Sequence, residues 1–211
     1  EVWPVRAGDE RVGTDLARML AGVCHSRSAL YFDGGDFVAD NRTVFVAPGL
    51  RRRNIQYTVA TECELLNELA RTSGRRVLLL REAPDHHAGM FVMPAGDNTV
   101  LVGDPGLAEP MVAREDFTVS LDIDFSAESQ RLFDAVAEQC REAGYRVIRV
   151  PVCPGVDGRT WLTCLNAILD CRNGRRIVYM PIYRGAEPLN QAGEKAWRSL
   201  GYEVRRVDCT P

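Results

Sequence analysis

Two carboxylates, Asp33 and Asp36, bracket a pair of glycines in the segment YFDGGDFVAD, residues 31–40. Glycine has no Cβ, so a ligand or another part of the backbone can approach it closely. Two carboxylates that converge on a flat cation can accept its N–H groups in bidentate geometry. The segment therefore indicates a site for a guanidinium group, although Asp and Gly are equally typical of a tight turn.

A second group of ionisable residues stands at a corresponding place further along the chain. His86 and His87 precede Phe91 in PDHHAGMFVMP, residues 84–94, much as the first acidic residue precedes its own strand. Histidine transfers protons near neutral pH, so acid–base catalysis is its predicted role. A metal site at the two histidines is the weaker interpretation, because adjacent residues diverge on a strand and no third ligand stands out.

The third segment of this kind is WLTCLNAIL, residues 161–169, which carries Cys164 and Asn166. A cysteine acts as a nucleophile where its thiolate is stabilised. Its neighbours Leu162 and Leu165 instead favour an inert thiol in the core. Cys164 is therefore a candidate nucleophile only if the chain is complete.

The three segments occupy equivalent places in an internal repeat. Helical spacing of apolar residues leads each time to a glycine and a short aliphatic strand, and glycine is the natural residue just past a helix end. Apolar strands split by the turn-rich pieces ADNR, AGDN and CRNG complete the pattern. The helix–glycine–strand segments are SGRRVLLL (73–80), AGYRVIRV (143–150) and LGYEVRRV (200–207).

A weaker fourth copy opens the chain, with an apolar helical stripe formed by Val12, Leu16, Met19, Leu20 and Val23. A period of roughly fifty to seventy residues indicates one supersecondary unit used several times. One helix and three strands can bury a sheet in each unit, so we predict an α/β fold of pseudo-symmetric units whose strand ends share a centre. A doubly wound α/β sheet is the alternative.

The composition is that of a globular protein of 211 residues, 45% hydrophobic and 26% charged, with a net charge of −3. This balance favours neither nucleic acid nor an anionic membrane as a partner. No apolar run approaches the ~20 residues of a membrane span, and EVWPVRAGDE at the start shows no signal-peptide pattern. Seven cysteines without a CxxC pair predict no disulfide framework and no zinc site, but mostly buried thiols in a reducing cytoplasm.

The chain resembles the guanidino-group-modifying enzymes of the pentein fold, which include agmatine and arginine deiminases, dimethylarginine dimethylaminohydrolase and the amidinotransferases. The resemblance implies a five-unit α/β propeller of ββαβ-type repeats around a central active site. Residues 1–211 would form a single domain with about four of the five units, incomplete at both ends. The resemblance to the family rests on five segments that follow each other in the family's order: FDGGDFVADNRTVFVAPGLRRRN (32–54), HHAGMFVMPAGDNTVLVGDP (86–105), RTWLTCLNAIL (159–169), VYMPIY (178–183) and LGYEVRRVDC (200–209).

The resemblance also implies roles for individual residues. Asp33 would be the catalytic carboxylate that binds the guanidinium, and Asp36 would either support it or contact the second face of the substrate. His87 would be the acid–base histidine, with His86 as the alternative. Arg52 would bind a substrate carboxylate.

Two departures from the family pattern bear on the activity. Deiminases commonly have an aspartate two residues after the histidine, where this chain has Gly89. The family's nucleophilic cysteine is expected beyond the end of this chain, since Cys209 matches a structural strand by position. The function implied is hydrolysis of the guanidino group of an arginine-like or agmatine-like small molecule in arginine metabolism, without a cofactor and with a homodimer as the expected assembly. An amidinotransferase and a non-catalytic guanidino-binding or scaffold protein are the alternatives.

Overall fold

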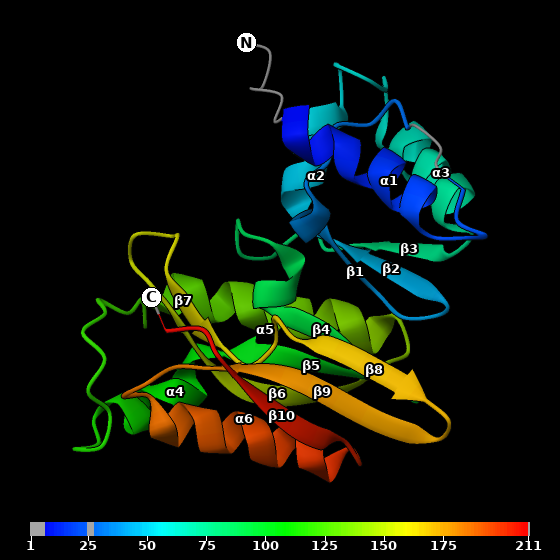
Figure 1. Ribbon diagram of the computed structural model, residues 1–211. Helices are drawn as coiled ribbons and strands as arrows, with labels where there is room; N and C mark the ends of the chain where they lie inside the picture. Colours follow the sequence, from blue (N-terminus) through cyan, green and yellow to red (C-terminus); the bar gives the residue numbers. More distant parts are fainter. Residues whose placement is uncertain (1–6, 25–27, 211) are drawn as a thin grey trace. The chain divides into compact units, whose positions relative to one another are not determined.

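The computed structural model describes residues 7–24 and 28–210 (Figure 1). The chain divides into two compact parts, residues 1–30 and 31–211, so the prediction of a single domain stays a prediction. The first part contains α1 (Ala7–Met19). This helix confirms the predicted helical stripe up to Met19, whereas Leu20 and Val23 lie beyond its end.

The second part, residues 31–211, repeats one unit three times (Figure 1). In each unit the first two strands are antiparallel, and the third strand returns parallel to the second after one or two helices. The units are β1 (Phe37–Ala39), β2 (Thr43–Val46), α2 (Pro48–Asn54), α3 (Glu62–Ser73) and β3 (Arg76–Leu79); β4 (Val92–Gly96), β5 (Thr99–Asp104), α4 (Pro105–Val112), α5 (Ala127–Glu142) and β6 (Arg146–Pro154); and β8 (Ile168–Arg172), β9 (Arg175–Ile182), α6 (Glu187–Ser199) and β10 (Glu203–Asp208).

The strand register is similar in the first two units. Thr43 pairs with Arg76 at the start of the parallel strands of the first unit, and Thr99 pairs with Arg146 in the second. A further strand, β7 (Trp161–Thr163), adds antiparallel to β6. Within the described residues the strands form three separate sheets, so the predicted pseudo-symmetric α/β architecture is confirmed and the doubly wound sheet is not.

Local sequence explains where these elements begin and end. The side chains of Thr61 and Ser126 accept backbone N–H groups at the starts of α3 and α5, as N-cap residues do. Gly74, Gly144 and Gly201 follow the three predicted helices and have positive φ, as the helix–glycine–strand pattern requires. The predicted turns also form, with the hairpin between β8 and β9 closing on Asn173-Gly174 at positive φ.

Each sheet buries its inner face against helices. Phe133 and Val136 of α5 pack with Val100 and Val102 of β5 in one cluster. Trp197 of α6 is fully buried in a second cluster, where its indole N–H donates to the Cys164 carbonyl at 3.1 Å. These contacts hold the ends of the strands in place, and the candidate site lies at those ends.

The residues from Asp33 to Asp36 form a short 3₁₀ turn directly ahead of β1. One expectation from the sequence is wrong. The thiols are not mostly buried: Cys140, Cys153 and Cys164 are, whereas Cys24, Cys63, Cys171 and Cys209 are exposed. Cysteine is small and weakly polar, so its type alone does not decide its burial.

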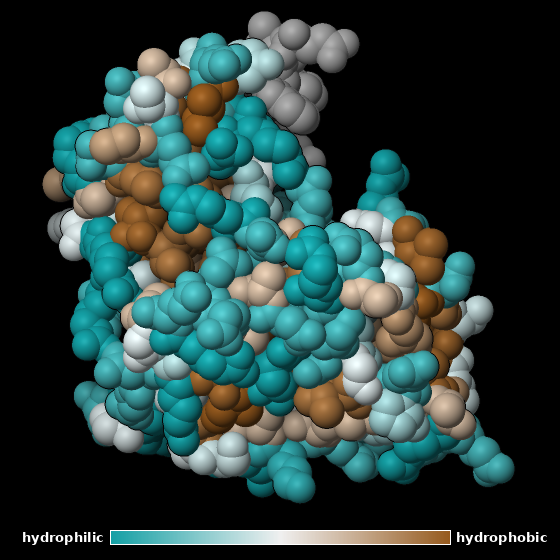
Figure 2. Space-filling view, turned by 180° about the vertical axis from the view of Figure 1, so that it is seen from behind, coloured by the Kyte–Doolittle hydropathy of each residue, from teal (hydrophilic) through white to brown (hydrophobic). Residues whose placement is uncertain are grey.

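The surface carries many charged side chains. Figure 2 shows one face on which hydrophilic residues cover most of the area and apolar residues gather in separate small groups. Many of the charges are paired, as between Arg131 and Glu128 on α5. No helix among the described residues has both the length and the apolar character needed to cross a membrane.

Candidate active site

The Asp33 loop is built by reciprocal capping of a short turn, η1 (Gly34–Asp36). The Asp33 carboxylate accepts the Gly35 N–H at 3.0 Å, and the Asp33 N–H donates to Asp36 Oδ2 at 2.7 Å. Both bonds satisfy backbone groups that a helix start leaves free. The Asp33 side chain is fixed at its base and remains 46% exposed, so it can contact a ligand.

His87 occupies the same place in the second unit. It precedes a second turn, η2 (Ala88–Met90), which contacts η1. Phe37 ends the first turn and Phe91 the second, so the two loops are structural equivalents. The repeat seen in the sequence therefore brings the predicted acid and the predicted histidine to adjacent loops.

The two side chains lie next to each other. His87 Nε2 is 3.6 Å from Asp33 Oδ1, a distance at which protonated histidine and carboxylate attract each other. The imidazole lies against Gly35, where an added Cβ would stand only 2.2 Å from His87 Cγ. The second glycine of the motif therefore makes room for the histidine ring, whereas a Cβ at Gly34 would meet nothing within 4 Å.

Asp36 is committed to the protein itself. Its side chain is 4% exposed and forms an ion pair with Arg53, which stands at the end of α2. Since Asp36 also accepts the Asp33 N–H, its carboxylate supports the Asp33 loop. Of the two roles expected for Asp36, this geometry favours support of Asp33, since a substrate would have to displace Arg53 from a buried carboxylate.

Arg52, the predicted ligand for a substrate carboxylate, forms an ion pair with Asp85 instead. Both side chains are more than half exposed. Asp85 lies two residues before His87 in the sequence, so the ion pair ties α2 to the histidine loop. The structure thus leaves Arg52 at the surface and directs the next arginine, Arg53, inward.

The space beside Gly89 is taken by an amide. A Cβ at Gly89 would stand 3.0 Å from Asn166 Oδ1, in the segment before β8. The family resemblance implies a carboxylate at this position in deiminases, and here Asn166 places an oxygen acceptor close beside Gly89. The sequence showed the missing aspartate but did not identify its neighbour, because the contact joins residues of different units.

Cys164 is not placed to act as a nucleophile. Burial raises the pKa of its thiol to about 12, so almost no thiolate forms near neutral pH. The side chain packs against α6, where a Cβ at Gly193 would stand 2.9 Å from Cys164 Sγ. Cys164 is therefore a core thiol, the interpretation that its neighbours Leu162 and Leu165 favour.

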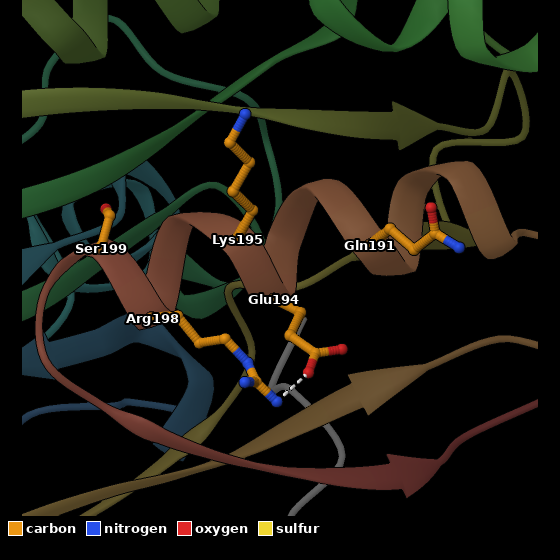
Figure 3. A pocket seen from close by; sticks show the side chains of 5 residues that line it. All are labelled: Gln191, Glu194, Lys195, Arg198 and Ser199. Atoms are coloured by element: carbon orange, nitrogen blue, oxygen red, sulfur yellow. Dashed lines mark hydrogen bonds and ion pairs between the residues drawn. The ribbon is translucent and has the colours of Figure 1, made fainter.

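Other features do not add to the site. No group of three or more His, Cys, Asp or Glu side chains could hold a metal ion in the part of the chain that the structure describes. A shallow hollow runs along one face of α6 (Figure 3), where Glu194 is bound by Arg198. All residues that line this hollow belong to a single helix: Gln191, Glu194, Lys195, Arg198 and Ser199.

Comparison with known proteins identifies the fold. No protein-family model and no curated protein matches the chain. Several solved structures do match. A protein from Porphyromonas gingivalis described as an arginine deiminase matches at 20% identity and a TM-score of 0.70, over 95% of this chain and 59% of that one. C. jejuni agmatine deiminase matches at 16% identity and a TM-score of 0.63, over 95% of this chain and 57% of that one. Another, described as an agmatine deiminase, matches at 15% identity and a TM-score of 0.68 over 98% and 59% of the two chains.

The chain thus spans less than two thirds of the length of each of these structures. Likeness at such low identity reports the backbone arrangement. It agrees with the repeated ββαβ units of this chain. The chain therefore has the pentein fold, the fold of the guanidino-group-modifying enzymes.

Proposed function

We propose that this protein hydrolyses the guanidino group of an arginine-like or agmatine-like small molecule. The observation that carries the proposal is the juxtaposition of the Asp33 carboxylate and the His87 imidazole, 3.6 Å apart on equivalent loops of two units. One group can bind a planar cation and the other can transfer a proton. The shared fold with proteins described as agmatine and arginine deiminases supports the same reaction class.

The reaction would begin with orientation of the guanidinium. The Asp33 carboxylate accepts its N–H groups from one side, and the Asn166 amide oxygen is available as a neutral acceptor beside Gly89. Resonance makes the guanidinium carbon a poor electrophile, so close positioning matters. Asp36 and Arg53 do not touch the substrate but hold the Asp33 loop through the Asp33 N–H.

A cysteine thiolate other than Cys164 would then attack the guanidinium carbon. As the C–N bond breaks, protonated His87 gives its proton to the departing nitrogen, which leaves as a neutral amine or ammonia. His87 next removes a proton from water, and the resulting hydroxide attacks the same carbon. The C–S bond breaks, the thiolate is restored, and the product carries a urea group. An amine in place of water would give amidino transfer, which is the variant that this geometry also accommodates.

A non-catalytic guanidino-binding protein is the second candidate. The observation that favours it is the burial of Cys164. This cysteine lies two residues from Asn166 in the sequence, and its burial prevents it from acting as the nucleophile. In this case Asp33 and Asn166 would hold the ligand without turnover. Product formation separates the two candidates, because only the enzyme releases a ureido compound.

The test measures binding and turnover separately with agmatine, arginine and methylated arginines. We expect calorimetric binding that Asp33→Asn weakens by about 10- to 100-fold, the loss typical of a hydrogen bond to a charged group, about 1.5–3 kcal/mol. Asn keeps an oxygen for the Gly35 N–H, so the loop should persist. Asp85→Asn is the matched control, since Asp85 is an exposed carboxylate paired with Arg52.

The outcomes are distinct. Turnover to a ureido product that His87→Ala abolishes supports the hydrolase. Binding that depends on Asp33, without product, supports the binding protein. Equal affinities of wild type and Asp33→Asn for every guanidino compound would remove both candidates.

We also propose a cytoplasmic protein that forms homodimers. Four exposed cysteines without disulfide partners among the described residues support a reducing compartment. Size-exclusion chromatography with light scattering would test the dimer.

A further inference from the structure

His86 makes a specific contact with the backbone of the proposed catalytic histidine. Its Nδ1 accepts the His87 N–H at 2.8 Å. Its ring packs on Trp161 of β7 with centroids 5.0 Å apart, and Trp161 in turn packs on Phe133 at 5.7 Å. His86 therefore links the loop of His87 to the buried core of the second unit.

This contact demands one protonation state. A nitrogen that accepts a hydrogen bond carries no proton, so Nδ1 must be unprotonated. The neutral ring then carries its proton on the other nitrogen, Nε2. In this form Nδ1 can accept the His87 N–H. The doubly protonated ring would instead direct an N–H group at the N–H of His87.

We propose that His86 is a positioning residue, which in its neutral form holds His87 beside Asp33 and releases it when protonated. His86 does not touch the substrate and acts only through the His87 backbone. The importance of this control for activity rests on the proposed function, whereas the coupling of the two histidines does not.

Burial and the neighbouring charges together set the pH at which His86 is protonated. Burial and the neighbouring His87 lower its pKa below the ordinary value of about 6.5, whereas the Arg159 backbone, Asp85 and Asp157 act in the opposite direction. The unfolded chain thus binds a proton at His86 more readily than the folded chain does. The free energy of unfolding should therefore fall as the pH drops through and below 6.5, and recover above it.

Two substitutions distinguish the hydrogen-bond acceptor of His86 from the rest of its ring. His86→Asn can present an oxygen close to the position of Nδ1 and cannot be protonated in this range. His86→Leu fills a similar volume without an acceptor. Both substitutions are made in a chain that also carries His25→Gln, which removes the signals of the third histidine in the sequence. Circular dichroism checks that each variant folds.

The primary measurement is the NMR signal of the His87 amide proton between pH 4.5 and 8. In the wild-type chain we expect it to lie downfield and to move upfield with the protonation of His86, at a midpoint below 6.5. In His86→Asn it should stay downfield across the range. In His86→Leu it should lie upfield at every pH. A wild-type His87 amide that ignores the protonation of His86, or one that His86→Leu leaves unchanged, overturns the proposal.

Tryptophan fluorescence gives an independent signature. A protonated imidazole quenches a neighbouring indole, so the emission of Trp161 should fall on acidification with the same midpoint. The change should disappear in His86→Asn and in Trp161→Phe. If both variants keep the transition, the proposal is wrong. Neither measurement needs a ligand, so failure to bind any guanidino compound would count against the proposed function while leaving this coupling intact.

Discussion

An alanine at position 35 would occupy the space that the His87 ring now fills. Its Cβ would stand 2.2, 2.4 and 2.6 Å from Cγ, Nδ1 and Cδ2 of that ring. Ordinary contact begins near 3.4 Å, so the imidazole would have to retreat by about 1.2 Å. The ring is 52% exposed and can swing into water, which would carry it away from the Asp33 carboxylate.

The expected effects on stability and on chemistry differ in size. The lost interaction is an exposed pair, so the free energy of unfolding should fall by no more than about 1 kcal/mol. A shift of about 1 Å in a catalytic group can cost on the order of 100-fold in rate. We therefore expect Gly35→Ala to lower turnover of a guanidino substrate by about 100-fold while the protein remains folded.

The assay follows the ring directly as well as turnover. Nuclear Overhauser contacts between the Gly35 Hα and the His87 ring should be present in the wild-type chain and in Gly34→Ala. Gly34 is the matched control, because its added Cβ would meet nothing within 4 Å. The reasoning is refuted if Gly35→Ala leaves the His87 signals and turnover as they are in Gly34→Ala.

Three further predictions concern residues around this pair. Arg53→Met should lower the free energy of unfolding in chemical denaturation by about 2 kcal/mol, because it leaves the buried Asp36 carboxylate without its partner. Arg52→Met should lower it by less than about 1 kcal/mol, because its ion pair with Asp85 is exposed. Equal losses in the two variants would contradict the assignment of Arg53 as the inner arginine. Cys164, whose thiol pKa is raised to about 12, should resist iodoacetamide at pH 8 in the folded chain and react after denaturation, and mass spectrometry that finds it labelled as fast as Cys209 would argue against its burial. Asn166→Ala should weaken calorimetric binding of agmatine or arginine by about tenfold, the worth of about one hydrogen bond, and an unchanged affinity would remove this amide from the site.

The sequence could predict the site loops because their signals are local. The acidic residues and glycines of the Asp33 loop cap a short turn through bonds within four residues. The glycines after the helices and the Asn-Gly hairpin mark boundaries for the same reason. Because the units repeat, the sequence also places His86 and His87 at a strand entrance equivalent to that of Asp33, and the family resemblance selects His87 of the two.

Only the tertiary structure decided which neighbours meet across units. Arg52 and Arg53 are consecutive on a helix, about 100° apart around its axis, and long-range packing turns the second toward Asp36. Asn166 reaches the space beside Gly89 from a different unit. Such contacts depend on how separate sheets and helices pack, and no pattern within one segment records them.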